Sequence, residues 1–326
     1  MPNSLRLAYL VFEARKPARW ERFMKDMLGL PAPTVHADGS TGWRVDGASQ
    51  RLVVTAGPRD DLAAVGLECA DEHELRQLVQ RLQAAGHRAE PGDAALCSQR
   101  KVQHLWHVND PEQGRVELCV GLAEAATPFA SAAFPDGFET GALGLGHVVL
   151  VAQDLAAMEA FYGGLLGFGV TERLQTQVGP VHIRGTFMHC NQRHHSLALF
   201  DLPSSFRIHH FMLQARSLRD VGRAFERAES LGLPIDLDLG QHPEPDGTFS
   251  FYAETPSGFA FEIGAQTQAI DPSGWQTMHT HETSTWGHQP RLRLKLKMAR
   301  ELIKSRFRGR RRHPSQAAGT ATGATS

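Results

Sequence analysis

Short apolar runs followed by helical patterns recur along the chain. Residues 7–12 (Leu-Ala-Tyr-Leu-Val-Phe) and residues 145–150 (Leu-Gly-His-Val-Val-Leu) both have the character of buried strands. Each run is followed by a polar break and then by a segment with helical spacing, at 18–27 and at 155–165. Both helical segments end at a Leu-Gly pair, and glycine is a frequent stop signal for helices. The glycines, at 29 and 167, place the two copies 138 residues apart (167 − 29).

A second pair of units continues this pattern. The apolar runs at 65–69 and 210–214 each lead into a helical segment that ends at an Ala-Gly or Leu-Gly pair, and each unit closes on a further apolar run. The chain therefore contains four strand–helix–strands units, near residues 5–60, 62–122, 143–202 and 207–266. We expect an α+β fold in which four βαβββ modules pair into two domains, and a length of 326 residues agrees with two domains.

The same pattern predicts where the domains begin and end. We expect an N-terminal domain at 1–122, a linker rich in Ala, Pro and Gly at 123–142, and a second domain at 143–290. A tail at 291–326 follows, and it begins with a strongly basic segment of helical spacing. The residues after Pro314 are mostly Ala, Gly, Thr and Ser, so we expect them to be disordered.

The composition of the whole chain hides an uneven distribution of charge. With 34 basic and 35 acidic residues the formal net charge is −1, which favours neither a nucleic-acid nor a membrane partner. From Arg291 onward, however, 11 basic residues stand against one acidic residue, so residues 1–290 carry 23 basic and 34 acidic residues, a net of −11. We expect the tail to be a solvated, partly disordered extension, and docking on the acidic body, a neighbouring subunit or an anionic surface stays open.

Cysteine spacing and the N-terminal residues point to a cytoplasmic location. The cysteines show neither zinc-knuckle nor CxxC spacing, so we expect free thiols in a reducing cytosol: Cys69, Cys97, Cys119 and Cys190. The first seven residues lack the apolar core of a signal peptide, and we expect no transmembrane segment because no apolar stretch is long enough to span a bilayer.

The two halves carry different side chains at corresponding strand positions. To about one residue, His147, His210 and Glu262 of the second half correspond to Tyr9, Ala64 and Leu118 of the first. Glu262 lies in a run, 259–263, that is apolar on both faces, and a buried carboxylate is costly unless it is paired or bound to a metal. Two imidazoles and one carboxylate form the set that holds Fe(II) on one face and leaves positions open for substrate and oxygen.

The residues alone leave other interpretations of these three side chains open. A buried glutamate often pairs with an Arg or Lys, and a histidine at a strand start is often structural. The spacings of 63 residues from 147 to 210 and 52 from 210 to 262 form no local motif.

Longer segments of the second half favour the metal site over these other interpretations, because they match a known family. They cover most of 143–290 and comprise 144–147 (Gly-Leu-Gly-His), 187–195, 208–213, 240–242, 250–258, 261–262 and 286–288. Through them the second half resembles the catalytic domain of the type I extradiol ring-cleavage dioxygenases, which belong to the vicinal oxygen chelate superfamily. The first half resembles the degenerate N-terminal domain of that family more loosely, through Trp20, residues 28–30 and residues 43–44.

The resemblance implies a role for each matched residue. His147, His210 and Glu262 match the metal ligands. His195 matches the acid–base catalyst beside bound oxygen, and the second catalytic pair, His242 and Tyr252, matches residues that hydrogen-bond the substrate hydroxyls. In each of the histidine pairs 194/195 and 209/210 the family uses the second residue.

The implied substrate-binding residues overlap this catalytic set. They are His195, His242, Asp246 and Tyr252, together with the apolar Val149 and Phe187, which are candidates for lining an aromatic pocket or for plain core packing. The loop 242–247 is about one residue longer than is usual in the family, which affects the pose of His242 and the equivalence of Asp246.

The implied activity is Fe(II)-dependent extradiol (meta) cleavage of a catechol that carries a second ring or a bulky substituent, such as 2,3-dihydroxybiphenyl, with insertion of both atoms of O2. Mn(II) accepts the same ligand types. The resemblance also implies a homo-oligomer, often an octamer, and no nucleic-acid partner.

Two alternatives stay open. One is another metalloenzyme of the superfamily, such as a glyoxalase or a 4-hydroxyphenylpyruvate dioxygenase, and neither reaction requires the set His195, His242 and Tyr252. The other is a ligand-sequestering protein, which would not need a buried metal triad. We expect His104 and His107 to be structural or surface residues, whereas His279, His281 and His288 follow the last unit, where one of them could close over the site.

Overall fold

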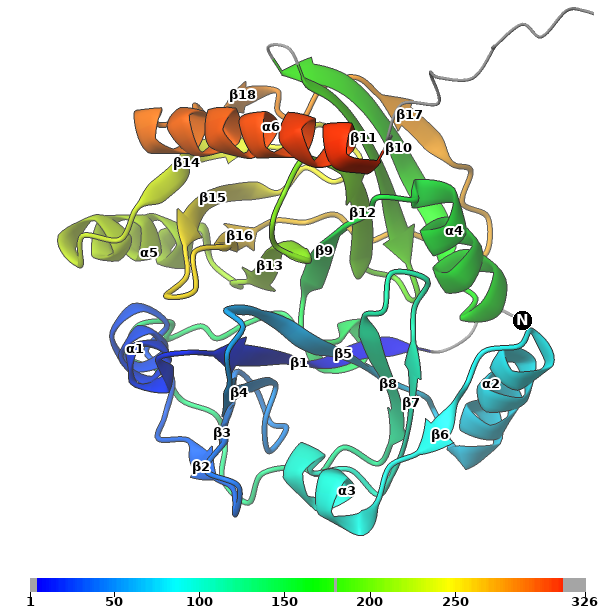
Figure 1. Cartoon of the computed structure of the whole chain (residues 1–326). Coiled ribbons are helices and arrows are strands. Elements are labelled where there is room, and N and C mark those ends of the chain that lie inside the picture. The colour runs from blue at the N-terminus through cyan, green and yellow to red at the C-terminus, as the bar shows by residue number, and fades with distance from the viewer. Residues whose placement is uncertain (1–4, 179–180, 313–326) are drawn as a thin grey trace, which may run out of the picture.

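Two sheets, one from each half of the chain, organise the fold (Figure 1). The computed structural model describes residues 5–178 and 181–312. The first half contains β1 (Arg6–Ala14), α1 (Pro17–Arg22), the π-helical turn η1 (Phe23–Met27), β2 (Thr34–Val35), β3 (Thr41–Trp43), β4 (Leu52–Ala56), β5 (Asp61–Glu68), α2 (Glu72–Ala84), β6 (Glu90–Pro91), α3 (Ala94–Arg100), β7 (His104–Asn109) and β8 (Arg115–Val120).

The second half repeats this order and adds a C-terminal part. It contains η2 (Gly141–Leu143), β9 (His147–Val151), α4 (Leu155–Glu159), the π-helical turn η3 (Ala160–Leu165), β10 (Gly169–Val178), β11 (Val181–His189), β12 (Leu197–Asp201), β13 (Ile208–Gln214), α5 (Leu218–Ser230), β14 (Ile235–Gln241), β15 (Phe249–Glu254) and β16 (Ala260–Ala265). Then follow β17 (Met278–Thr280), β18 (Trp286–Gly287) and α6 (Leu292–Arg312).

Strand pairing confirms the four βαβββ modules and the α+β class. In every module the first strand pairs in parallel with the last: β1 with β4, β5 with β8, β9 with β12 and β13 with β16. The two modules of each half join through antiparallel pairs of their first strands, β1 with β5 and β9 with β13. The resulting strand orders are β2-β3-β4-β1-β5-β8-β7-β6 and β17-β10-β11-β12-β9-β13-β16-β15-β14-β18.

Local signals explain where the helices begin and end. Asp71 and Ser217 cap α2 and α5, because each side chain accepts a hydrogen bond from a backbone N–H of the first turn. The paired helices α1–η1 and α4–η3 both change from α to π geometry and are followed by glycines with positive φ, Gly29 (59°) and Gly167 (80°). The structure thus confirms that the two halves share the same helix endings.

The register corrects one expected correspondence between the halves. In the second sheet, residues facing each other across β9, β13 and β16 are His147, Met212 and Glu262, and in the first sheet the corresponding row is Tyr9, Gly66 and Glu117. The counterpart of Glu262 is therefore Glu117, not Leu118. β8 pairs with β5, and β16 with β13, in unbroken parallel register, so the match of Ala64 with His210 fixes this correspondence, whereas the apolar pattern fixes it only to about one residue.

The two halves share one hydrophobic core. The Phe12 ring of β1 stacks on Trp20 at 4.8 Å and lies 5.2 and 5.5 Å from the rings of Phe211 and Phe259 in the second half. The Trp20 indole N–H also donates to the Ser257 hydroxyl at 2.9 Å. Phe211 directly follows His210 along β13, so its side chain points to the opposite face of the strand. The first half therefore supports the back of a strand that carries a candidate ligand.

The segments between and after the sheets pack against them. Phe134 and Phe138, within the proposed linker 123–142, are buried in the shared core. The helix expected in the basic tail is present as α6, and its first half docks on the second domain, which corrects the expectation of a solvated extension there. The tail beyond residue 312, which was expected to be disordered, lies outside the described residues. Within the described ranges, no helix has both the length and the hydropathy that crossing a bilayer requires.

Candidate metal centre

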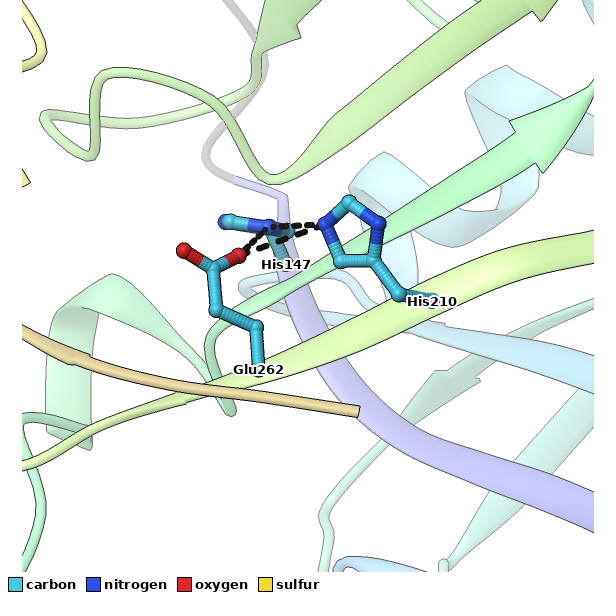
Figure 2. A group of neighbouring side chains, drawn as sticks. All are labelled: His147, His210 and Glu262. Atoms are coloured by element: carbon cyan, nitrogen blue, oxygen red, sulfur yellow. Dashed lines mark hydrogen bonds and ion pairs between the residues drawn. The ribbon is translucent and has the colours of Figure 1, made fainter. Parts of the chain in front are cut away.

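Three side chains from neighbouring strands of the second sheet converge on one point (Figure 2). His147 begins β9, His210 lies in β13 and Glu262 in β16, and all three are buried. Nε2 of His147 lies 3.1 Å from Nε2 of His210, and Oε2 of Glu262 lies 3.1 and 3.3 Å from these two nitrogens. The structure thus brings together the three residues that were predicted as ligands.

The donor atoms fit a small divalent cation. Two ligands at right angles, each about 2.1 Å from a metal, lie about 3.0 Å apart, close to the observed spacings. Both carboxylate oxygens of Glu262 are buried, and neither accepts a hydrogen bond from the described residues. A buried carboxylate without hydrogen bonds destabilises the folded state, and a cation bound by all three donors would compensate its charge.

Burial and neighbouring charges set the protonation of this cluster. Burial lowers the pKa of His210 to about 4, which leaves its imidazole neutral and able to donate a lone pair. Burial alone would raise the pKa of Glu262, but the close imidazoles, His147 and His210 first, hold it well below its usual range. Neutral imidazoles beside an ionised carboxylate are the states that metal binding requires.

A second histidine orients His210. Nδ1 of His210 lies 2.7 Å from Nδ1 of His209. Burial followed by the neighbouring His210 lowers the pKa of His209 to about 3, so its imidazole is neutral. In the tautomer that leaves the Nε2 lone pair of His210 free for the centre, the Nδ1–H of His210 donates to Nδ1 of His209.

His195 lies beside the centre, between a ligand and an aromatic ring. Its imidazole centroid is 4.0 Å from that of His147 and 4.9 Å from the ring of Phe187. Burial holds the pKa of His195 well below its ordinary value, with His147 and His194 adding to the effect. Asp246 is also buried, and one of its carboxylate oxygens lies within 4.8 Å of a ring nitrogen of His195. The lengthened loop thus keeps Asp246 near the centre.

His242 and Tyr252 form a hydrogen-bonded pair on the other side of Glu262. Nε2 of His242 lies 2.8 Å from the Tyr252 hydroxyl and 3.6 Å from Oε1 of Glu262. Nδ1 of His242 donates to the carbonyl of Thr283 at 2.6 Å. Burial would lower the pKa of His242, but Glu262 and Asp246 raise it to about 9. Burial also raises the pKa of Tyr252 well above its ordinary value.

The remaining predicted residues lie where the strands place them. Val149 is buried two residues after His147 in β9, so it lies on the same face of the strand. His104 is an exposed partner of Glu72, as expected of a surface residue. Nδ1 of His281 donates to the backbone carbonyl of Gln175 in β10 at 2.9 Å.

His288 is the one of the three histidines after the last unit that lies against His242 and Tyr252. Its imidazole packs 4.6 Å from that of His242 and 5.5 Å from the ring of Tyr252. The Ser284 hydroxyl lies 2.6 Å from its Nδ1. Burial lowers the pKa of His288 to about 4, so it supports His242 as a neutral ring. In the sequence, two features point to His288: its place after the last unit and its place in the matched segment 286–288.

The first half carries a closed counterpart of this centre. Glu117 is fully buried and accepts hydrogen bonds from the Arg100 guanidinium at 2.7 and 3.2 Å, from Arg115 at 2.7 Å and from the Tyr9 hydroxyl at 2.9 Å. Arg100 therefore supplies the positive charge that a metal would supply to Glu262. This explains in physical terms why the first half keeps the carboxylate without the two histidines.

The chain is similar to characterised ring-cleaving enzymes. Residues 144–263 match the Glyoxalase/Bleomycin resistance protein/Dioxygenase superfamily, and residues 7–57 match the first domain of dihydroxybiphenyl dioxygenase. The chain is 39% identical to biphenyl-2,3-diol 1,2-dioxygenase of Pseudomonas sp. (strain KKS102) over 287 residues, 87% of this chain and 97% of that protein. It is 33% identical to an iron-dependent extradiol dioxygenase of Rhodococcus jostii (strain RHA1), over 86% of this chain and 96% of that one.

A solved structure supports the same relationship. The fold matches the crystal structure of a halotolerant catechol dioxygenase with a TM-score of 0.81 and 33% sequence identity. The match covers 89% of this chain and 96% of that protein, so it takes in both sheets.

Proposed function

This chain belongs to the type I extradiol dioxygenases, which cleave catechols, and we propose that it uses Fe(II), held by His147, His210 and Glu262, to open a catechol with a second ring or a bulky substituent. The observation that carries the proposal is the buried carboxylate of Glu262, which has two imidazole nitrogens 3.1 and 3.3 Å from one oxygen and accepts no hydrogen bond from the part of the chain that the structure describes. The 39% identity to a ring-cleaving dioxygenase sets aside the glyoxalase and ligand-sequestering alternatives.

The proposed metal supplies one function. Fe(II) held by His147, His210 and Glu262 would bind the catechol oxygens and O2 and would supply the electron transfer between them. Iron is supported by the iron-dependent relative from Rhodococcus jostii.

His242 and Tyr252 are proposed to hold the catechol oxygens. Their hydrogen-bonded pair lies next to Glu262, with Nε2 of His242 3.6 Å from Oε1. The Thr283 carbonyl fixes the proton on Nδ1 of His242, so the other ring nitrogen faces the substrate side. A charged imidazole or a phenol placed there stabilises a catechol oxygen that has lost its proton.

His195 is proposed as the proton carrier on the opposite side. Its ring is confined between His147 and Phe187, so it is held in one place beside the ligands. An imidazole in this position can take a proton from a catechol hydroxyl and later hydrogen-bond an oxygen atom of the ring-opening step. Asp246, close to a ring nitrogen of His195, is proposed to orient it.

A substrate and metal panel tests this proposal. The protein is stripped of metal, reloaded without oxygen with Fe(II) or Mn(II), and assayed on catechol, 3-methylcatechol and 2,3-dihydroxybiphenyl. We expect activity with Fe(II) and the highest kcat/KM for 2,3-dihydroxybiphenyl. A preference for unsubstituted catechol, or activity with Mn(II) alone, would contradict the proposal.

A further inference from the structure

The C-terminal helix α6 joins the two ends of the second sheet (Figure 1). Next to β14, Pro290 pairs with Leu237, and the backbone N–H of Arg291 donates to the carbonyl of Asp236. Further along the helix, Leu302 packs against a buried cluster formed by residues of β10 and β11. These strands lie at opposite ends of the strand order, and the helix needs only about 15 Å to go from residue 292 to 302. The sheet is therefore strongly curved, and α6 spans its open side.

Ion pairs hold the start of α6 against β15, and burial shows which face of the helix points inward. Arg293 and Lys297 both donate to the carboxylate of Glu254 in β15, at 2.7 and 3.1 Å. Lys297 also donates to the carbonyl of Gly258 at 2.6 Å. On the outward face, by contrast, Ile303 is 55% exposed. Leu302 and Ile303 are thus neighbours in sequence that lie on different faces of one anchored helix.

Leu302 belongs to an apolar cluster that reaches the metal centre. The buried members of the cluster are Leu174, Val181 and Ile183, and the partly buried members are Phe187, Phe200, Leu202 and Leu302. The ring of Phe187 lies 4.9 Å from that of His195, and the ring of Phe200 lies 6.1 Å from that of His209. A continuous apolar path therefore leads from the imidazoles beside the ligands to the underside of α6.

We propose that Leu302, carried by α6, is a specificity-determining residue that contacts the apolar substituent of the catechol. The inference rests on the proposed function and deepens it. A catechol held through both oxygens at the ligands can place its substituent only on the side away from them. On the His195 side, the residues next to the substituent are the apolar side chains of this cluster. A second ring placed there buries their partly exposed apolar surface, and this burial favours binding.

The test compares two neighbouring positions of the full-length, Fe(II)-loaded enzyme. Leu302→Ala removes the proposed contact and Leu302→Trp fills its space, whereas Ile303→Ala and Ile303→Trp are matched controls on the outward face. The readout is the ratio of kcat/KM for 2,3-dihydroxybiphenyl, or for 3-methylcatechol, to that for catechol. Both Leu302 variants should lower the ratio about fivefold, mainly through KM, with catechol cleavage within about twofold of the wild type.

The outcomes separate this inference from the proposed function. Equal ratios in the wild type and both Leu302 variants, or the same change in the Ile303 controls, overturn the inference. If the wild type cleaves no bicyclic catechol, the substrate part of the proposed function fails, and the ratio for 3-methylcatechol still decides the role of Leu302. Loss of folding by one Leu302 variant leaves the decision to the other.

Discussion

At the residue scale, two carboxylates in matching positions face opposite electrostatic surroundings. Glu117 is surrounded by the guanidinium groups of Arg100 and Arg115, whereas the nearest charged or titratable partners of Glu262 in the salt-bridge range are the imidazoles of His147 and His210. Protein side chains alone balance the charge of Glu117. A bound cation would balance the charge of Glu262. The choice of partner thus separates a structural site from a metal site on the same backbone.

Substitutions at the centre should separate metal binding from turnover. Glu262→Ala removes the one anionic donor, so we expect loss of bound iron, measured by metal analysis after desalting. His195→Ala leaves all three donors in place, so iron should be retained while kcat falls by about 10²- to 10⁴-fold. Loss of iron from the His195 variant would show that this residue is a ligand or supports one.

Glu117 should contribute stability that depends on pH. Burial opposes ionisation, but Arg100 and then Arg115 hold the pKa of Glu117 below the ordinary 4.5. Its contribution is therefore fully present above pH 4.5 and is lost as the pH falls through the lowered folded-state pKa. Glu117→Gln should lower the free energy of unfolding at pH 7 by about 3 kcal/mol, with less further loss in acid.

Urea unfolding of both proteins between pH 3 and 7 measures this effect. Glu72→Gln is a suitable control because Glu72 is half exposed and pairs with Arg76 on the surface of α2. An equal pH dependence of the free energy of unfolding in the wild type and the Glu117 variant would show that Glu117 contributes no pH-dependent stability.

At the element scale, apolar periodicity predicted the modules, because each strand and helix has one face that it must bury. The same reasoning misplaced the counterpart of Glu262 by one residue, since β8 and β16 are apolar runs whose pattern does not fix the register to a single residue, whereas their pairing with β5 and β13 does. The site residues on strands were predictable from unusual polar side chains in apolar runs. Which of His279, His281 and His288 lies at the site was not predictable, because it depends on how the segment after β16 returns to His242.

The docking of α6 also depends on tertiary contacts. Its charge predicted a solvated helix, but Glu254 is buried and accepts from both Arg293 and Lys297. Glu254→Gln should release the helix, so backbone amides of residues 292–302 should exchange with deuterium about tenfold faster. Unchanged exchange in this segment would show that apolar contacts alone hold α6.

At the scale of the whole molecule, the two halves fold against each other. Phe12 and Trp20 of the first half pack on Phe211 and Phe259 behind the strands that carry His210 and Glu262. The metal-free half therefore acts as a support for the half that carries the site. This follows from strand alternation, because the residues next to the ligands point away from the centre.

Trp20→Ala should show this support directly. It removes a fully buried ring at the junction, so we expect the free energy of unfolding to fall by about 3–5 kcal/mol. Because the core is shared, calorimetry should still show one cooperative transition for both halves. Two separate transitions, with the second half unaffected, would contradict the idea of a common core.

The central claim is that His147, His210 and Glu262 hold the iron that opens a catechol ring outside its two hydroxyls. The most direct measurement is O2 uptake together with yellow product during cleavage of 2,3-dihydroxybiphenyl and other catechols by protein reloaded with Fe(II) without oxygen. We predict that one O2 is consumed per yellow ring-opened molecule in the wild type and none in Glu262→Ala. Absence of both O2 uptake and yellow product across several catechols, or full activity of the Glu262 variant, would contradict the claim.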